Sequence, residues 1–80
     1  MSSEIVEYLA RRLVDDPDAV RVETEERDGA VVLYLHVAPD DVGKVIGRQG
    51  RIARALRTLV RASSARDGRR VLVEIADPDE

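Results

Sequence analysis

The sequence VGKVIGRQGR occupies residues 42–51 and places Gly47 and Gly50 three positions apart, between a short apolar segment and a long amphipathic one. This spacing is typical of a tight connection between two helices. Gly47 can turn the chain at little steric cost, and Gly50 leaves the first amides of the next helix uncovered. Unpaired N–H groups and the positive end of the helix dipole both attract anions at such a position. The stretch therefore predicts an anion-binding turn between two helices.

Three segments have the apolar spacing of helices. The first begins after Ser2 and Ser3, which are suited to cap a helix N-terminus, and should end near Asp15-Asp16-Pro17. The second is short and lies between a loop at residues 39–41 and the first glycine, and the third runs from near Gly50 to about residue 66. The third helix should carry a core stripe of Ile52, Leu56, Leu59, Val60 and Ser63 beside an arginine stripe of Arg51, Arg54, Arg57 and Arg61.

The remaining segments indicate three strands. Residues 20–25 alternate between apolar or threonine side chains and charged ones, and Asp28-Gly29 predicts a hairpin turn into residues 30–37, the most apolar strand and the expected centre of the sheet. Residues 71–75 alternate again after a helix stop at Asp67-Gly68. The sequence thus predicts one α+β domain over residues 1–80, in the order α-β-β-α-α-β, with a frayed tail at 77–80.

The net charge of −3 hides a strong partition along the chain. Residues 1–43 carry eleven acidic residues against four arginines, a net charge of −7. Residues 44–70 carry nine basic residues against a single Asp, a net charge of +8, and the last ten residues add −4. A basic segment within an acidic chain creates a directed field, so the overall charge does not argue against a polyanionic partner.

The arginines of the third helix have no acidic partner nearby in the sequence. From Lys44 to Arg66 there is no Asp or Glu, so their repulsion must be relieved by another element or by a polyanion. A glycine pair alone marks a turn more often than a phosphate site. Here it occurs together with an apolar lead-in, Arg48, and an arginine face on the following helix. We interpret the combination as a site for a nucleic-acid phosphate backbone.

The sequence shows no pattern typical of catalysis or of a cofactor or metal site. It contains no cysteine, which removes disulfides and thiolate ligands and fits a reducing compartment. His36 is the only histidine, lacks a nucleophile pattern, and is interpreted as a sheet-surface residue. Neither glycine-rich nucleotide-binding motif occurs. We expect a protein that is not an enzyme and, because charged residues interrupt every apolar run, a soluble cytoplasmic one without a membrane segment.

The aromatic content bears on the type of nucleic-acid module. Tyr8 and Tyr34 are the only aromatic residues besides His36, so modules that stack bases on aromatic sheets are disfavoured. A backbone-binding turn beside an aliphatic groove remains open. The groove could be formed by Val42, Val45, Ile46 and Ile52.

The VIGRQG sequence at residues 45–50, with the flanking passages 13–18, 37–47 and 53–57, resembles a KH domain of the type II topology, and most closely the small single-KH bacterial RNA-binding proteins of the KhpA type. The resemblance covers nearly the whole chain. It implies a three-stranded sheet with helices packed on one face. It further implies single-stranded RNA held along the GxxG loop, with about four nucleotides read between the loop and the sheet. It also implies a homodimer, and association with a larger KH protein of the KhpB (Jag) type.

Together, the residue analysis and the resemblance give the RNA-binding set Val42, Lys44, Val45, Ile46, Gly47, Arg48, Gln49, Gly50, Arg51 and Arg54. We interpret the chain as a post-transcriptional regulator or RNA chaperone. One alternative is a structural module that works mainly as a dimer or with a KhpB (Jag) type protein. Another is a helix-hairpin-helix DNA-binding protein, which also has glycines between two helices but usually two apart, and which has no sheet.

Overall fold

The computed structural model describes residues 2–76, apart from the side chain of Asp67, and its elements follow the predicted order α-β-β-α-α-β. The expected tail at residues 77–80 lies outside the described part. The elements are α1 (Ser2–Leu13), β1 (Arg21–Arg27), β2 (Ala30–His36), α2 (Val42–Ile46), α3 (Arg51–Ser64) and β3 (Val71–Ile75). Short 3₁₀ turns occur at Pro17–Ala19, Pro39–Asp41, Arg48–Gly50 and Ala65–Asp67.

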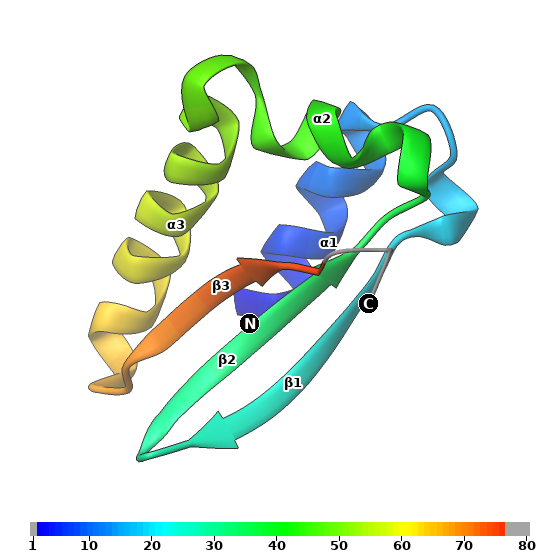
Figure 1. Cartoon of the computed structure of the whole chain (residues 1–80). Helices are drawn as coiled ribbons and strands as arrows, with labels where there is room; N and C mark the ends of the chain where they lie inside the picture. The colour runs from blue at the N-terminus through cyan, green and yellow to red at the C-terminus, as the bar shows by residue number, and fades with distance from the viewer. Residues whose placement is uncertain (1, 77–80) are drawn as a thin grey trace.

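The three strands form one mixed sheet with β2 at its centre, as predicted. β1 and β2 pair antiparallel from Arg21↔His36 to Arg27↔Ala30, and β2 and β3 pair parallel from Val31↔Val71 to Leu35↔Ile75. Asp28 and Gly29 both have positive φ angles, 55° and 82°, as a two-residue hairpin requires. A parallel pair needs a crossover connection, which α2 and α3 supply. Figure 1 shows α2 crossing the end of the sheet where β2 ends.

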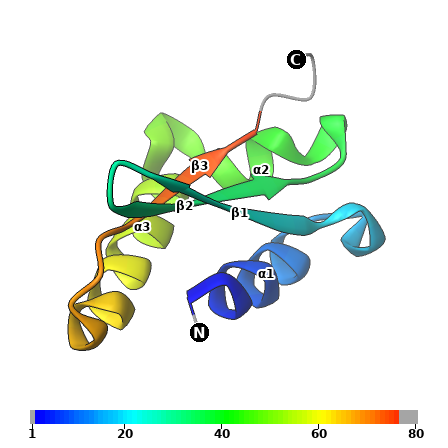
Figure 2. The ribbon, with the colours of Figure 1, turned by 90° about the horizontal axis from the view of Figure 1, so that it is seen from below.

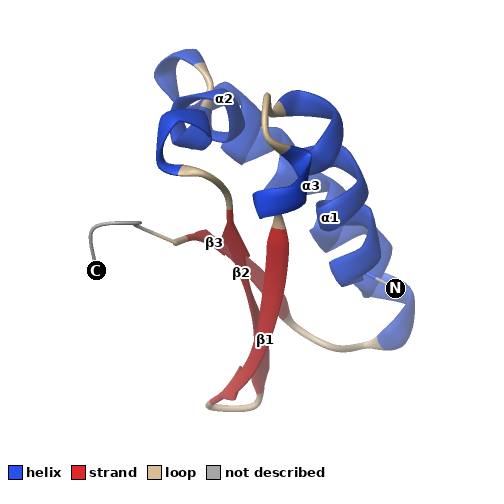
Figure 3. Cartoon of the chain, turned by 90° about the vertical axis from the view of Figure 1, so that its right-hand side faces the viewer, coloured by secondary structure: helices blue, strands red, loops and turns tan. Residues whose placement is uncertain are grey.

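The helices pack on one face of the sheet, which confirms the predicted arrangement (Figure 3). The core between the two layers consists of Val6, Ala10, Val20, Leu33, Leu35, Val45, Leu56, Val60 and Val73. The β2 side chains that alternate with Leu33 and Leu35 point to the other face of the sheet, and they include His36. The His36 ring lies beside the carboxylate of Glu23 at the sheet surface. His36 therefore occupies the type of position predicted for it.

Two predicted details of the helices are wrong. The buried face of α3 consists of Ala53, Leu56, Val60 and Ser64, whereas Leu59, predicted to lie in the core stripe, is 49% exposed. Small side chains at positions 53 and 64 face the protein interior, so the helix is rotated relative to the stripe expected from large apolar residues alone.

The second wrong detail concerns the start of α1. Ser2 and Ser3 lie inside the first turn of α1 and do not precede it, and the Ser2 hydroxyl lies 3.3 Å from the Ser63 hydroxyl. Within residues 2–76, none of the helices has the length and apolar character needed to cross a membrane.

Candidate nucleic-acid interface

The connection between α2 and α3 is a tight turn in which three of four residues have positive φ angles. Gly47 has φ 78° and ψ 170°, Gln49 has φ 58° and ψ 24°, and Gly50 has φ 73° and ψ 16°. The Gly47 amide donates to the Gly43 carbonyl at 2.9 Å, and the Gly50 amide donates to the Gly47 carbonyl at 3.1 Å. The predicted glycine-framed turn between two helices is therefore present, with a defined hydrogen-bonded geometry.

The first turn of α3 has no side-chain cap, because Gly50 occupies the N-cap position. The Gly50 and Arg51 amides at this helix start donate instead to the Gly47 and Arg48 carbonyls of the turn. Arg48 and Gln49 are exposed and lie directly before these amides, and the Arg51 guanidinium donates to the Gln49 side-chain oxygen at 3.2 Å. The turn therefore places exposed positive charge at the start of α3, where the helix dipole also favours an anion.

The arginines near the turn have no acidic partners in the described part of the chain. Among the described side chains, which exclude Asp67, no carboxylate lies within ion-pairing distance of Arg48, Arg51, Arg54, Arg57 or Arg61. Glu7 of α1 pairs with Arg11 at 2.9 Å and Glu23 of β1 pairs with Arg21 at 3.6 Å, whereas Glu26 of β1 pairs with the distant Arg69 at 3.3 Å. The separation of charge expected from the sequence therefore persists at these five arginines, whereas Lys44 and Arg69 of the same basic segment pair with acidic residues of the first half of the chain.

A small pocket between α3 and the edge of the sheet was not identified from the sequence. The Arg57 Nε atom donates to the backbone carbonyl of Val73 at 3.3 Å. The pocket has a volume of about 110 Å³ and is lined by Arg57, Arg61, Val71, Leu72, Val73 and Glu74. The spacing of the arginine stripe indicated Arg57. The contribution of β3 could not be foreseen, because it depends on the parallel pairing of β3 with β2.

The aliphatic residues predicted to line the groove differ in exposure. Ile46 is 36% exposed, and Val42 and Ile52 are half-buried. Val45 is completely buried in the core, so it supports α2 from below and does not present a surface to a ligand. Of the four, Ile46 is therefore the most accessible apolar side chain beside the turn.

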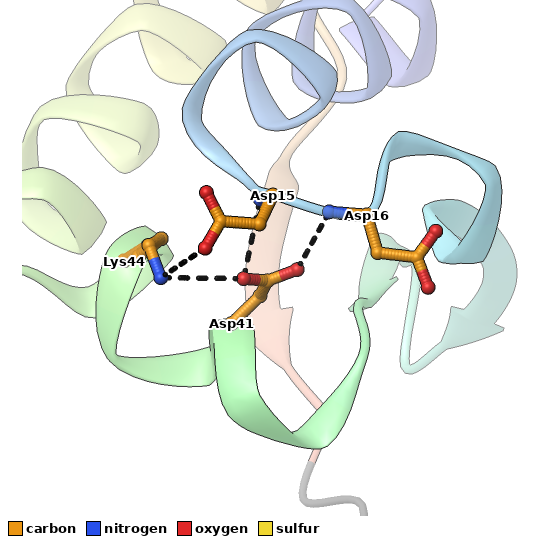
Figure 4. A network of polar contacts seen from close by, with 4 residues as sticks. All are labelled: Asp15, Asp16, Asp41 and Lys44. Carbon is orange, nitrogen blue, oxygen red and sulfur yellow. Dashed lines mark hydrogen bonds and ion pairs between the residues drawn. The ribbon is translucent and has the colours of Figure 1, made fainter.

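Lys44 belongs to an ion-pair network and differs in this respect from the arginines (Figure 4). Its Nζ atom lies 3.0 Å from Asp15 Oδ2 and 3.5 Å from Asp41 Oδ1. The adjacent Asp15 carboxylate, together with Asp41, raises the pKa of Lys44 above its usual value, although burial opposes the shift. Lys44 is thus near the turn, but its charge is already paired within the protein.

Comparison with known proteins agrees with this architecture. The family model described as KhpA/KhpB, KH domain, matches residues 3–75. A protein of Caldanaerobacter subterraneus subsp. tengcongensis named RNA-binding protein KhpA is 51% identical over 72 residues, which cover 90% of this chain and 96% of that protein. Proteins of the same name from Treponema pallidum and Streptomyces coelicolor are 51% and 48% identical, and each match covers at least 96% of both chains. With its α-β-β-α-α-β order and its glycine-framed turn, the chain belongs to the KhpA/KhpB family of type II KH domains.

Proposed function

We propose that this chain binds single-stranded RNA, with the sugar–phosphate backbone along residues 47–50 and the bases in the groove between α3 and the edge of β3. The observation that carries the proposal is the setting of Arg48. This exposed cation lies in a glycine-framed turn, directly before α3, whose first turn has no side-chain cap, and it has no acidic partner among the side chains that the structure describes. The name of the relatives, RNA-binding protein KhpA, supports the same function.

The groove supports short, weakly selective binding. Aliphatic carbon at Ile46 and the pocket beside Arg57 offer contact surface, and no aromatic side chain lines that pocket. Base selectivity should therefore be modest, which fits our proposal of a cytoplasmic post-transcriptional regulator or RNA chaperone. A helix-hairpin-helix DNA-binding protein is not favoured, since that fold has no sheet and this chain has three paired strands.

The loop proposal is tested by titrating a labelled single-stranded RNA of mixed sequence with the wild type and with the double variant Arg48→Asp, Gln49→Asp. Both side chains are exposed, so we expect RNA binding to be abolished while the Tm stays nearly unchanged. Arg66→Asp is the control, because it also lowers the net charge but lies about 20 Å away at the other end of α3. If the double variant retains wild-type affinity, the loop is not the binding site.

The salt dependence provides a second test of the same site. If about three phosphates are neutralised, a plot of log K against log salt should have a slope of roughly −2 for a single strand. A flat salt response would indicate a ligand other than a polyanion.

We further propose that the chain self-associates through an apolar surface on α1 and α3. This α1–α3 surface comprises Ile5, Tyr8, Leu9, Leu13, Ala55 and Leu59. Tyr8 is 60% exposed, and Leu59 lines three neighbouring hollows of the surface. Figure 2 shows α1 and α3 on the same side of the sheet. Exposed apolar side chains that are contiguous in this way are typical of protein–protein contacts.

A second copy of the chain is the occupant that we propose for this surface. Arg51 and Arg54 line its edge, so a pair of chains would bring two basic loops near one another. Two weak sites that are linked in this way gain avidity for one RNA strand. Family membership also suggests a KH domain of a KhpB (Jag) type protein as a partner, and the same surface is our candidate for that contact.

A further inference from the structure

The side chain of Asp41 stands at the start of α2 but bonds to a different segment of the chain. An aspartate at a helix N-cap normally accepts hydrogen bonds from the first amides of its own helix. The Asp41 side chain makes no such bond, although it occupies the N-cap of α2. Its Oδ1 and Oδ2 atoms instead accept the backbone N–H groups of Asp15 at 3.2 Å and of Asp16 at 3.0 Å (Figure 4).

Asp41 is a buried carboxylate whose partners come from two directions. The residue is 2% exposed, so its negative charge needs compensation from within the protein. Two backbone donors approach from the segment that follows α1, and the Lys44 ammonium approaches from one turn further along α2. Lys44 also contacts Asp15, which closes the Asp41 network of Asp15, Asp16, Asp41 and Lys44.

The Asp41 network acts on an element that has little stability of its own. α2 has only five residues, and a helix of that length depends on contacts with the rest of the protein. Val45 provides one such contact, because its side chain is fully buried in the core. The Asp41 network provides another, and the glycine-framed turn begins directly after α2 at Gly47.

We propose that the Asp41 network fixes α2 against the end of α1 and thereby holds the residue 47–50 loop ready for RNA, with Lys44 as a positioning residue that does not contact phosphate. The inference rests on the proposed RNA-binding function and assigns Lys44 a role different from that expected from the sequence. If only a fraction of the molecules had the loop in the conformation that binds RNA, the apparent affinity would be lower by that fraction. A loop that is ordered before binding avoids this loss.

The RNA test compares Lys44→Met with Arg48→Met over a series of salt concentrations at a temperature where both variants are folded. Lys44→Met should lower the affinity about three- to tenfold at every salt concentration without changing the slope of log K against log salt. Arg48→Met should make the slope shallower by about 0.7, the contribution of one single-strand phosphate contact. Lys44→Arg should restore most of the affinity. The proposal is overturned if Lys44→Met makes the slope as shallow as Arg48→Met does, or leaves affinity unchanged.

A second measurement needs no RNA and therefore separates this proposal from the proposed function. Amide hydrogen exchange is compared in the wild type, Lys44→Met, Asp41→Asn and Asp40→Asn, the last being an exposed neighbour that makes a matched control. Lys44→Met and Asp41→Asn should accelerate exchange at Asp15 and Asp16 and at the hydrogen-bonded amides of Gly47 and Gly50, whereas Asp40→Asn should not. Unchanged exchange at Gly47 and Gly50 in both network variants would refute the positioning role. A wild type that binds no RNA would refute the proposed function instead.

Discussion

The Cβ atom of any L-residue placed at Gly47 would lie 2.7 Å from Cγ1 of Ile52 and 2.9 Å from the Ile52 backbone nitrogen. The backbone of Gly47, with φ 78° and ψ 170°, also lies in a region that is essentially restricted to glycine. Gly50 differs, because a Cβ there would meet nothing within 4 Å and only its φ of 73° disfavours a side chain. The two glycines of the turn are therefore required for different physical reasons.

We expect Gly47→Ala to destabilise the protein by about 2–4 kcal/mol, because it adds a steric clash with Ile52 to the backbone strain. Gly50→Ala should cost about 1–2 kcal/mol, from the left-handed backbone alone. Urea denaturation of both variants provides the comparison. Equal losses would show that the close approach of the turn to Ile52 does not contribute to stability.

Leu56 and Leu59 on α3 should respond very differently to truncation. Leu56 is 3% exposed and lies in the core, so Leu56→Ala should lower the free energy of unfolding by about 2–4 kcal/mol. Leu59 is half exposed on the α1–α3 surface, so Leu59→Ala should cost less than about 1 kcal/mol. Chemical denaturation at a protein concentration too low for association measures both values. A loss at Leu59 as large as that at Leu56 would be inconsistent with the observed rotation of α3.

Self-association should depend on Leu59 but not on another exposed leucine. Sedimentation velocity of the wild type over a range of concentrations should show a dimer, and Leu59→Glu should shift it to monomer because a carboxylate would be buried in the apolar contact. Leu72→Glu is the matched control, since Leu72 is 40% exposed but lies on β3, away from the α1–α3 surface. A monomeric wild type at every concentration, or equal effects of the two variants, would contradict the proposed interface.

Stability should fall at both ends of the pH scale through the Asp41 network. Burial alone would raise the pKa of Asp41, but the Asp15 and Asp16 amides and Lys44 outweigh it and hold that pKa below its ordinary value of 3.8. The contribution of Asp41 is therefore present above about pH 4 and is lost as the pH falls through the lowered pKa. The pKa of Lys44 is raised above 10.5, so its contribution is present below that pH and is lost as the pH rises through the raised value.

The Tm of the wild type and of Asp41→Asn, measured from about pH 2 to pH 12, checks this expectation. Between about pH 5 and pH 9 the wild type should have a higher Tm than Asp41→Asn. The difference in Tm between the two proteins should become smaller in acid, because Asp41 of the wild type is then protonated. Asp40→Asn serves as the control, because Asp40 is exposed. A difference that persists undiminished at the acid limit would exclude the ionised Asp41 carboxylate as the source of the stabilisation.

Features that depend on neighbouring residues were well predicted from the sequence. The Asp28-Gly29 hairpin, the apolar strand at the centre of the sheet, and the glycine-framed turn all follow from signals within a few residues of one another. The fold class followed from the order of these local signals together with the resemblance to KH domains. For the same reason the helix and strand limits lie within a few residues of those expected.

Features that depend on contacts between distant segments could not be predicted in this way. The rotation of α3 places Ala53 in the core and leaves Leu59 outside, because the space available beneath a helix is set by the sheet and not by the helix itself. Asp41 and Asp16 are 25 residues apart, and nothing in either local sequence indicates their hydrogen bond. Lys44 was predicted to bind RNA because its ion pair with the distant Asp15 could not be foreseen from the sequence.

Amide chemical-shift changes during titration of the ¹⁵N-labelled chain with a short single-stranded RNA test the proposed site most directly. We expect the largest changes at residues 46–51 and around Arg57 and Val73, with small changes on the α1–α3 surface and at the β1–β2 hairpin. Saturable changes that map instead to the opposite face of the sheet around His36, or the absence of changes at Gly47 to Gly50, would contradict an RNA-binding site built on this turn.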